Sequence, residues 1–446
     1  MNTSYIKEAL LVSLLIGGLG LGLIGCDTFE VKNPGRILDI DLNQPRALDA
    51  LVTGMSADFS EGFDDLAFLG ARLSDEMEAS GSYFLSTRVR HGIIDYRDTD
   101  PYWEDAQRSR FVAEDGLRRM KEVLGEAFDG DPRTARAYFF AGLSNRVLGE
   151  NFCRVVFDGG PDEPKEAAFQ RAVQYFTEGI SQAQQAGTND LLLAMYGGRA
   201  QAYMGLGDWD KAVADAARVP TDFVYYALYS DNSTREYNEI YDETHRRHEM
   251  SAYKTLANIV ADERGGVPDP RAPFTDCREG GCPNTQGADG STPHLRQEKY
   301  QGYGADIPVV KGTEMRLIEA EAALLAGDLS TFIDKINEVR TFYGLEPAEN
   351  VYSDQARSTV GSLDQDYATV DDAWDILDRE RYLTLWLEGR RLWDLHRWNH
   401  PFLQGGTIVY PGVNPRASCV PISQSECQTN ENVDKTRNCQ PYAGGG

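Results

Sequence analysis

Residues 379–398 read RERYLTLWLEGRRLWDLHRW, with leucine, tryptophan and arginine recurring at short intervals. Leu383, Trp386 and Leu387 follow helical spacing, which predicts that they share one apolar face of a helix. Gly389 costs about 1 kcal/mol relative to alanine inside a helix. Its presence therefore indicates close backbone packing or a break in the helix.

The charges of the same stretch also suit a helical scaffold. Asp394 lies four residues after Arg390 and three before Arg397, so it can pair along the helix surface. The spacing therefore predicts a structural element and not a ligand site.

This stretch resembles the C-terminal signature of the SusD/RagB family, roughly E-R-x-x-E-L-x-x-E-G-x-R-x-x-D-L-x-R-W. The residues in register are Glu380, Arg381, Leu385, Glu388, Gly389, Arg391, Asp394, Leu395, Arg397 and Trp398. Thr384 stands where the family usually has glutamate. The resemblance implies a cell-surface lipoprotein that captures glycans or peptides for an outer-membrane transporter.

Shorter runs extend the resemblance along the chain. Similar runs are Asp269-Pro270-Arg271, Lys299-Tyr300, Ile307-Pro308-Val309-Val310 and, in the tail, Pro421-Ile422-Ser423 with Glu426. The resemblance is strongest after residue 300 and weakest in residues 44–130.

The N-terminus reads as a lipoprotein leader. Residues 1–25 combine Lys7 with an uncharged, apolar, glycine-rich run, and Leu23-Ile24-Gly25-Cys26 matches a bacterial lipobox. Cys26 is therefore the predicted lipidation site, and several acyl chains would hold the protein at the membrane. An ordinary leader or an anchor helix is the alternative. We expect residues 26–43 to be an acidic tether and the mature protein to be lipid-anchored at the outer-membrane surface.

The chain is strongly acidic. Its 446 residues hold 70 Asp and Glu against 44 Lys and Arg, which gives a net charge of −26. Such a charge disfavours nucleic acid and anionic membrane surfaces. It suits neutral or cationic cargo, or simply high solubility.

Six cysteines remain when Cys26 is assigned to lipid, an even number in an exported protein. Cys277 and Cys282 bracket a short loop and form the surest disulfide candidate. The others are Cys153, Cys419, Cys427 and Cys439, of which Cys153 could staple the tail to the helical body. A zinc site is the alternative, but the spacings fit no common four-cysteine pattern and the compartment is oxidising.

A weak helical repeat predicts the fold class. Residues 137–149, 199–212 and 318–328 are alanine-rich segments that reach Leu/Ala-Gly, usually with an acidic residue next. They resemble tetratricopeptide (TPR) helix pairs, in which glycine ends the first helix. We therefore expect an all-α dominated, SusD-like fold with helix pairs at about 131–219 and 313–398.

Two stretches break this pattern. Residues 221–310 are rich in Tyr, Gly, Pro, Asp and Thr and are interpreted as a loop-rich, ligand-binding insertion, and residues 399–446 show no helical period. Together with the helix pairs they form one SusD-like domain over residues 44–446.

No segment carries a recognisable catalytic pattern, so we expect a binding protein without a cofactor and not an enzyme. The best metal-like cluster runs from Asp242 to Glu249 and contains His245 and His248. It matches neither H-E-x-x-H nor H-x-x-E-H, and two arginines oppose a cation. A solvated charged helix is the favoured interpretation of this cluster.

Ligand binding is expected at aromatic side chains in loops, because sugars stack on rings and peptides would need a deeper apolar pocket. The candidates are Tyr83, Phe84, Tyr225 and Tyr237. Core packing is the alternative role for each.

Two functions follow from these patterns. The first is a SusD-like lipoprotein that binds oligosaccharides or peptides for a SusC-like TonB-dependent β-barrel, with the helical half (131–219 and 313–345) on the barrel and residues 221–310 facing the cargo. The second is a TPR-type envelope scaffold that binds proteins and no nutrient. The signature at 379–398 favours the first.

Overall fold

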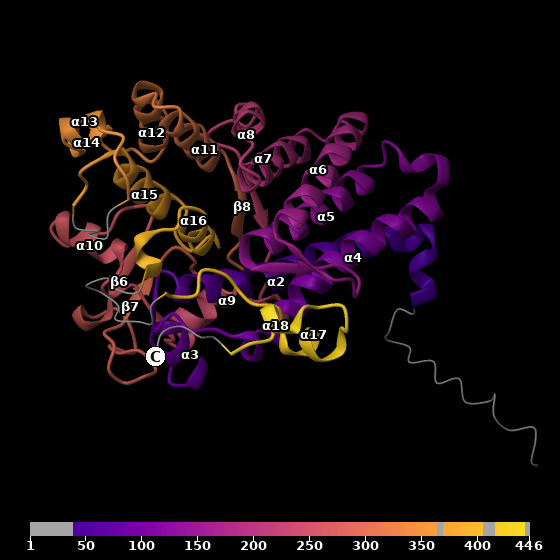
Figure 1. The fold of residues 1–446 in the computed structure, drawn as a ribbon, viewed down its shortest axis with the longest axis horizontal. Coiled ribbons are helices and arrows are strands. Elements are labelled where there is room, and N and C mark those ends of the chain that lie inside the picture. The colour runs from indigo at the N-terminus through magenta and orange to yellow at the C-terminus, as the bar shows by residue number, and fades with distance from the viewer. Residues whose placement is uncertain (1–38, 364–368, 405–414, 442–446) are drawn as a thin grey trace, which may run out of the picture. The chain divides into compact units, whose positions relative to one another are not determined.

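The computed structural model describes residues 39–363, 369–404 and 415–441 (Figure 1). The chain divides into two units, Met1–Asn43 and Gln44–Gly446. In the first unit only η1 (Asp39–Asn43) is described. Cys26 lies outside the described residues, so its lipidation stays a prediction. Among the described residues, no helix has both the length and the apolar composition that crossing a membrane requires.

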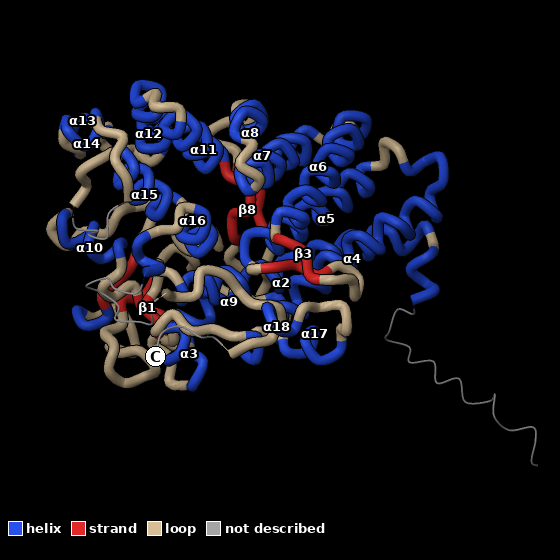
Figure 2. The backbone as a smooth tube through the Cα atoms, in the orientation of Figure 1, coloured by secondary structure: helices blue, strands red, loops and turns tan. Residues whose placement is uncertain are grey.

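A succession of packed helices forms much of the second unit, and the all-α prediction is confirmed (Figures 1 and 2). Each helix contacts the next along the chain. They are α2 (Leu48–Leu73), α4 (Asp100–Leu124), α5 (Pro132–Asn151), α6 (Glu166–Ala186), α7 (Asn189–Gly205), α8 (Trp209–Ala216), α11 (Gly312–Leu325) and α12 (Leu329–Phe342).

The Gly-Asp pairs of the repeat mark the turns between paired helices. Gly207 and Gly327 have φ angles of 71° and 74°, which an L side chain rarely adopts, and they follow α7 and α11. Asp208 and Asp328 then cap α8 and α12 by accepting hydrogen bonds from the backbone N–H groups of Lys211 and Thr331. In each Gly-Asp pair, the glycine therefore ends one helix and the aspartate is the N-cap of the next.

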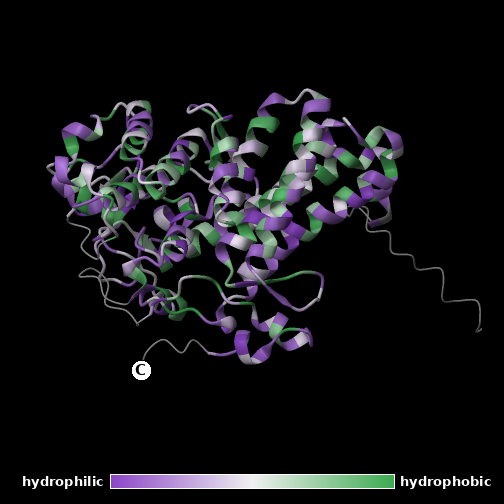
Figure 3. Cartoon of the chain, turned by 45° about the horizontal axis from the view of Figure 1, so that its top comes forward, coloured by the Kyte–Doolittle hydropathy of each residue, from purple (hydrophilic) through white to green (hydrophobic). Residues whose placement is uncertain are grey.

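Amphipathic helices bury one continuous core between α11, α12 and α15 (Ala373–Thr384). Leu317, Phe332, Ile336 and Leu377 are fully buried there. Hydrophobic and hydrophilic residues alternate along most helices, as Figure 3 shows, so that each helix can cover its neighbour and still face water.

The signature stretch is two helices and not one. α15 ends at Thr384 and α16 spans Arg391–Arg397, and between them Leu387 and Gly389 have φ angles of 59° and 68°. A Cβ on Gly389 would lie 3.2 Å from the Cβ of Ala67, so both the break and the close packing predicted for this glycine are found. The shared helical face predicted for Leu383, Trp386 and Leu387 is wrong because the helix ends before two of them, although all three are buried.

Buried ion pairs connect the signature to distant segments. Glu380 binds Arg271 at 2.5 Å, and Arg381 binds Asp394 at 2.9 Å. Arg391 binds Asp75 at 2.6 Å and also Asp378. Burial leaves these charges little water, so each depends on its partner.

The pairing expected for Asp394 is half correct. Asp394 accepts from Arg397 at 2.8 Å, as the spacing predicts. Arg390 instead reaches Glu150 on α5 at 2.5 Å and Glu314 on α11 at 2.9 Å. The break at Gly389 turns Arg390 away from the face of α16 and toward the other helices.

Short elements fill the remaining stretches. The two-stranded sheets are β1 (Glu78–Ala79) with β5 (Met250–Ser251), β2 (Arg154–Val156) with β3 (Asp162–Pro164), β4 (Val224–Ala227) with β8 (Ile307–Lys311), and β6 (Phe274–Asp276) with β7 (Leu295–Gln297), all antiparallel. The short helices are α3 (Phe84–Arg90), α9 (Glu239–Tyr241), α10 (Leu256–Glu263), α13 (Ala348–Val351), α14 (Asp354–Ser358), α17 (Gln424–Thr429) and α18 (Lys435–Asn438). Single turns are η2 (Pro45–Ala47), η3 (Tyr96–Asp98), η4 (Gly125–Phe128), η5 (Thr234–Glu236), the π-helical η6 (Asp242–Arg246), η7 (Cys277–Glu279) and η8 (Pro401–Gln404). Residues 221–310 and the tail thus contain more helix than their composition predicts.

Three disulfides join the six cysteines considered above. They are Cys277–Cys282, Cys153–Cys419 and Cys427–Cys439. Cys153 follows α5, so its bond to Cys419 fixes the tail on the helical body, as the sequence suggested.

We expect Arg391→Met to lower the free energy of unfolding by about 3–5 kcal/mol, because it leaves Asp75 and Asp378 without their buried partner. Chemical denaturation measures this loss. The matched control is Arg118→Met on α4, where an exposed arginine pairs with Asp115 and Glu122 and the loss should stay below about 1 kcal/mol. Equal losses for the two variants would contradict the scaffold role of the signature.

Candidate functional site: a tyrosine cluster on a π-helical turn

The segment formed by α9 and η6 carries Tyr241 and His245 and lies beside Tyr237 and Tyr303. Asn238 caps α9, since its side-chain oxygen accepts from the backbone N–H of Tyr241 at 2.9 Å. Its amide nitrogen donates to the carbonyl of Ala305 at 2.7 Å, and its backbone N–H donates to the carbonyl of Tyr303 at 2.7 Å. One asparagine thereby holds the start of α9 beside the loop that carries Tyr303.

Four rings gather at this junction, and we call Tyr237, Tyr241, His245 and Tyr303 the tyrosine cluster. Tyr237 stacks on Tyr303 with centroids 4.0 Å apart, and Tyr241 meets Tyr303 edge-on at 5.0 Å. Tyr241 also stacks on His245 at 4.3 Å. Each ring is partly exposed, so the cluster offers a shallow aromatic surface to solvent.

The surface of the cluster is close to neutral. Burial, helped by the nearby Arg296, lowers the pKa of His245 to about 4, so the imidazole is uncharged at pH 7. The exposed Arg246 pairs with the buried Asp242 at 2.6 Å. The rings are thus flanked by a neutralised ion pair that can still donate hydrogen bonds, a combination that suits sugar hydroxyls.

A buried carboxyl group lies on the same turn, and the solvated helix expected there is wrong. Glu239, Asp242 and Glu243 each bring one oxygen to within 4.8 Å of the others, and Glu243 is only 1% exposed. The π-helical turn directs these residues inward. Burial, with Glu239 and Glu249 nearby, raises the pKa of Glu243 to about 9, so this group holds a proton at neutral pH.

Arginines pair with the carboxyl groups of this turn. Arg247 contacts Glu243 at 2.9 Å, in addition to the Arg246–Asp242 pair. His248 adopts a φ angle of 56° beyond the end of η6, so it does not share a helix face with His245. The histidine spacing of the sequence therefore does not bring His245 and His248 together on one helix face.

The four aromatic candidates lie in three places. Tyr237 belongs to the tyrosine cluster. Tyr83 precedes α3 and accepts a 2.6 Å hydrogen bond from Arg72, while Phe84 beside it is 78% exposed. Tyr225 lies in β4 with its ring edge-on to Phe139 at 4.6 Å, next to a separate cavity of about 640 Å³.

Sequence reasoning missed Tyr303 as a ligand candidate because it lies far along the chain from Tyr237. The one sequence signal near Tyr303 was the family-like pair Lys299-Tyr300, which lies just before it. Lys299 binds Glu388 at 2.6 Å, and the Tyr300 hydroxyl donates to the carbonyl of Leu387 at 2.9 Å. The motif thus anchors the loop that presents Tyr303.

Comparison with known proteins finds similarity to SusD-like proteins. Residues 275–442 match the sequence profile of the SusD family. No curated protein sequence matches the chain. Solved structures share the fold, among them a SusD-like carbohydrate-binding protein from Bacteroides vulgatus with 13% identity and a TM-score of 0.61, aligned over 88% of this chain and 98% of that one.

Two further structures agree with this assignment. A SusD/RagB family protein from Bacteroides thetaiotaomicron has 13% identity and a TM-score of 0.59, over 86% of this chain and 94% of that one. A laminarin-binding SusD-like protein has 16% identity and a TM-score of 0.56, over 87% and 98%. The profile match over residues 275–442 and the shared fold both agree with the SusD-like resemblance of the sequence.

The protonated Glu243 gives a prediction about stability and pH. Its pKa in the folded state lies above the ordinary value of 4.5, so its stabilising contribution is complete below about pH 4.5 and is lost as the pH rises through about 9. Glu243→Gln cannot ionise, so we expect the variant to lose less stability than the parent between pH 5 and pH 9.

Denaturant unfolding at pH 5, 7 and 9 measures this difference. Glu279→Gln, at an exposed position, is the control and should follow the parent protein at every pH. Parallel stability curves for Glu243→Gln and the parent would show that Glu243 is already ionised in the folded protein.

Proposed function

We propose that the protein is a surface-exposed lipoprotein that binds oligosaccharides and delivers them to a SusC-like TonB-dependent transporter. The observation that carries this proposal is the tyrosine cluster, in which Tyr237 and Tyr303 stack at 4.0 Å on a partly exposed surface. Aromatic faces bind the C–H faces of sugars, and the match of residues 275–442 to the SusD family profile supports nutrient capture.

The chemistry of the cluster favours oligosaccharides over peptides. The rings form a shallow surface without a deep apolar pocket, and the imidazole of His245 is neutral at pH 7. Arg246 and Asp242 lie beside the rings and can exchange hydrogen bonds with hydroxyl groups. The carbohydrate-binding and laminarin-binding proteins of the same fold support this choice. The role is binding and not catalysis.

A transporter partner follows from the predicted anchor. A protein held at the surface through Cys26 would need another protein to move cargo across the membrane. The family resemblance supplies the SusC-like barrel, and the packed helices α5 to α8 with α11 and α12 offer it a broad, stiff face. Residues 221–310, which carry the whole tyrosine cluster, would then face the cargo.

We predict that Tyr237→Ala or Tyr303→Ala weakens oligosaccharide binding about five-fold each, since one stacked ring contributes about 1 kcal/mol. Isothermal titration calorimetry with a panel of glucan trisaccharides, laminaritriose included, measures the affinity. Tyr225→Ala, in a separate cavity, is the matched control and should bind like the parent protein. Unchanged binding by both cluster variants would reject this surface as the site.

A second prediction concerns the partner. Mild detergent extraction through a tag on this protein should recover a TonB-dependent barrel of about 100 kDa, an order-of-magnitude size for a chain that forms a wide barrel. Cys26→Ser should move the protein to the soluble fraction and is the control for anchoring. Recovery of soluble envelope proteins alone would favour a TPR-type scaffold instead.

A further inference from the structure

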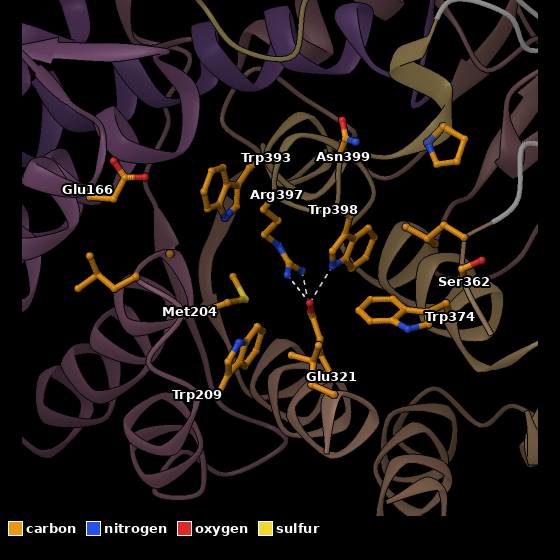
Figure 4. A pocket seen from close by; sticks show the side chains of 16 residues that line it. Glu166, Met204, Trp209, Glu321, Ser362, Trp374, Trp393, Arg397, Trp398 and Asn399 are labelled. Carbon is orange, nitrogen blue, oxygen red and sulfur yellow. Dashed lines mark hydrogen bonds and ion pairs between the residues drawn. The ribbon is translucent and has the colours of Figure 1, made fainter. Parts of the chain in front are cut away.

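A second aromatic site lies elsewhere in the fold and shares no residue with the tyrosine cluster. Four of the six tryptophans of the chain, Trp209, Trp374, Trp393 and Trp398, line one cavity of about 690 Å³ (Figure 4). We call it the tryptophan pocket. It lies where the helix pairs meet the signature helix, because Trp209 begins α8, Trp374 lies in the first turn of α15, and Trp393 belongs to α16.

The walls of the tryptophan pocket are apolar and partly open. Trp374 meets Trp398 edge-on with centroids 6.0 Å apart, and both rings are partly exposed, as is Trp209. Met204 and Leu325 also line the cavity. Its volume falls within the range of small-molecule sites, roughly 300–1,000 Å³.

The buried carboxylate inside the pocket is neutralised within the protein, while the exposed Glu166 lines its edge. The buried carboxylate of Glu321 accepts from Arg397 at 2.7 Å and from the indole N–H of Trp398 at 2.7 Å (Figure 4). Both oxygens of Glu321 are therefore engaged, and Arg397 has no unbalanced charge. A charged ligand would find no free counter-ion at this point.

One hydrogen-bond donor in the pocket lacks an acceptor. Trp393 is only 4% exposed, and its Nε1–H has no partner among the described residues. The ring is held by Phe169 at 5.3 Å and by Lys165, whose Nζ lies 4.6 Å from the ring centroid. Figure 4 shows the indole nitrogen facing the cavity. A buried donor without a partner costs about 1–3 kcal/mol. The nitrogen is itself closed to solvent, so a ligand oxygen would recover this energy by binding it after a small movement of the ring.

These features specify the chemistry of an occupant. It must present flat apolar faces to the indoles, bring an acceptor oxygen to Trp393, and carry no net charge. Hydroxyl-bearing groups would also meet the polar side chains of Asn399 and Ser362, which are exposed at the rim. A pyranose satisfies all of these requirements, since its C–H faces are apolar and its hydroxyl and ring oxygens accept hydrogen bonds.

We infer that the tryptophan pocket is a second saccharide-binding site, which takes one end of a neutral oligosaccharide. The inference rests on the proposed function only in requiring that the protein binds saccharides. Two separate sites on one chain would increase the retention of long glycans compared with either site alone.

Tryptophan fluorescence and calorimetry on the full chain in detergent test the inference with three probes, laminaritriose, cellotriose and maltotriose. Trp393→Phe removes the N–H donor together with part of the ring and should weaken binding at the pocket at least about five-fold. Trp209→Ala removes one wall and should abolish the fluorescence change. Tyr225→Ala, outside both aromatic sites, is the matched control and should leave the fluorescence change intact, while Tyr237→Ala reports on the other site. Unchanged circular dichroism and thermal midpoints establish that each variant is folded.

The outcomes separate the two proposals. Saccharide binding that persists in the pocket variants and is lost only in the Tyr237 variant overturns this inference and leaves the proposed function standing. Binding that is lost only in the pocket variants supports the inference and rejects the tyrosine cluster as the site. No binding of any probe to the parent protein overturns both. Tighter binding of choline than of any trisaccharide would show a cation site and overturn the inference.

Discussion

Buried pairing between arginines and carboxylates around residues 379–398 is the interaction on which the rest of the structure depends. Arg390 joins α5 to α11 through Glu150 and Glu314, and Arg391 holds the turn after α2 through Asp75. Glu380 holds Arg271 from the loop-rich region. Each pair joins segments that are distant in sequence. Because an uncompensated buried charge is strongly unfavourable, the pairs allow one arrangement of the helices and exclude others.

The same network positions both aromatic sites. Glu388 binds Lys299 and thereby holds the loop that ends in Tyr303 against the break in the signature. At the other end of the signature, Arg397 and Trp398 converge on Glu321 and form one wall of the tryptophan pocket. Residues that the sequence marked as scaffold therefore set the geometry of the sites without belonging to the tyrosine cluster. Trp398 has both roles, because it donates to Glu321 in the scaffold and also lines the tryptophan pocket.

Sequence reasoning was strongest where local chemistry determines local structure. The Gly-Asp pairs at 207–208 and 327–328 predicted helix boundaries because a left-handed residue and an N-cap act within one turn. It failed where the outcome depends on distant partners. Tyr303 reaches Tyr237 only because Asn238 binds Ala305 and Tyr303 across the fold. Three of the four tryptophans of the pocket come from different helices, and nothing in their spacing indicated that they converge.

The net negative charge of the chain makes local neutralisation necessary at a site that binds uncharged ligands. With a net charge of −26, exposed grooves on this protein will attract cations in general. Both aromatic sites reduce this bias locally at their buried carboxyl groups, by different means. At the tyrosine cluster, burial keeps His245 neutral while the adjacent Glu243 retains a proton. In the tryptophan pocket, Arg397 neutralises Glu321. An acidic surface that keeps the protein soluble is thus compatible with sites whose selectivity rests on aromatic faces and hydrogen bonds.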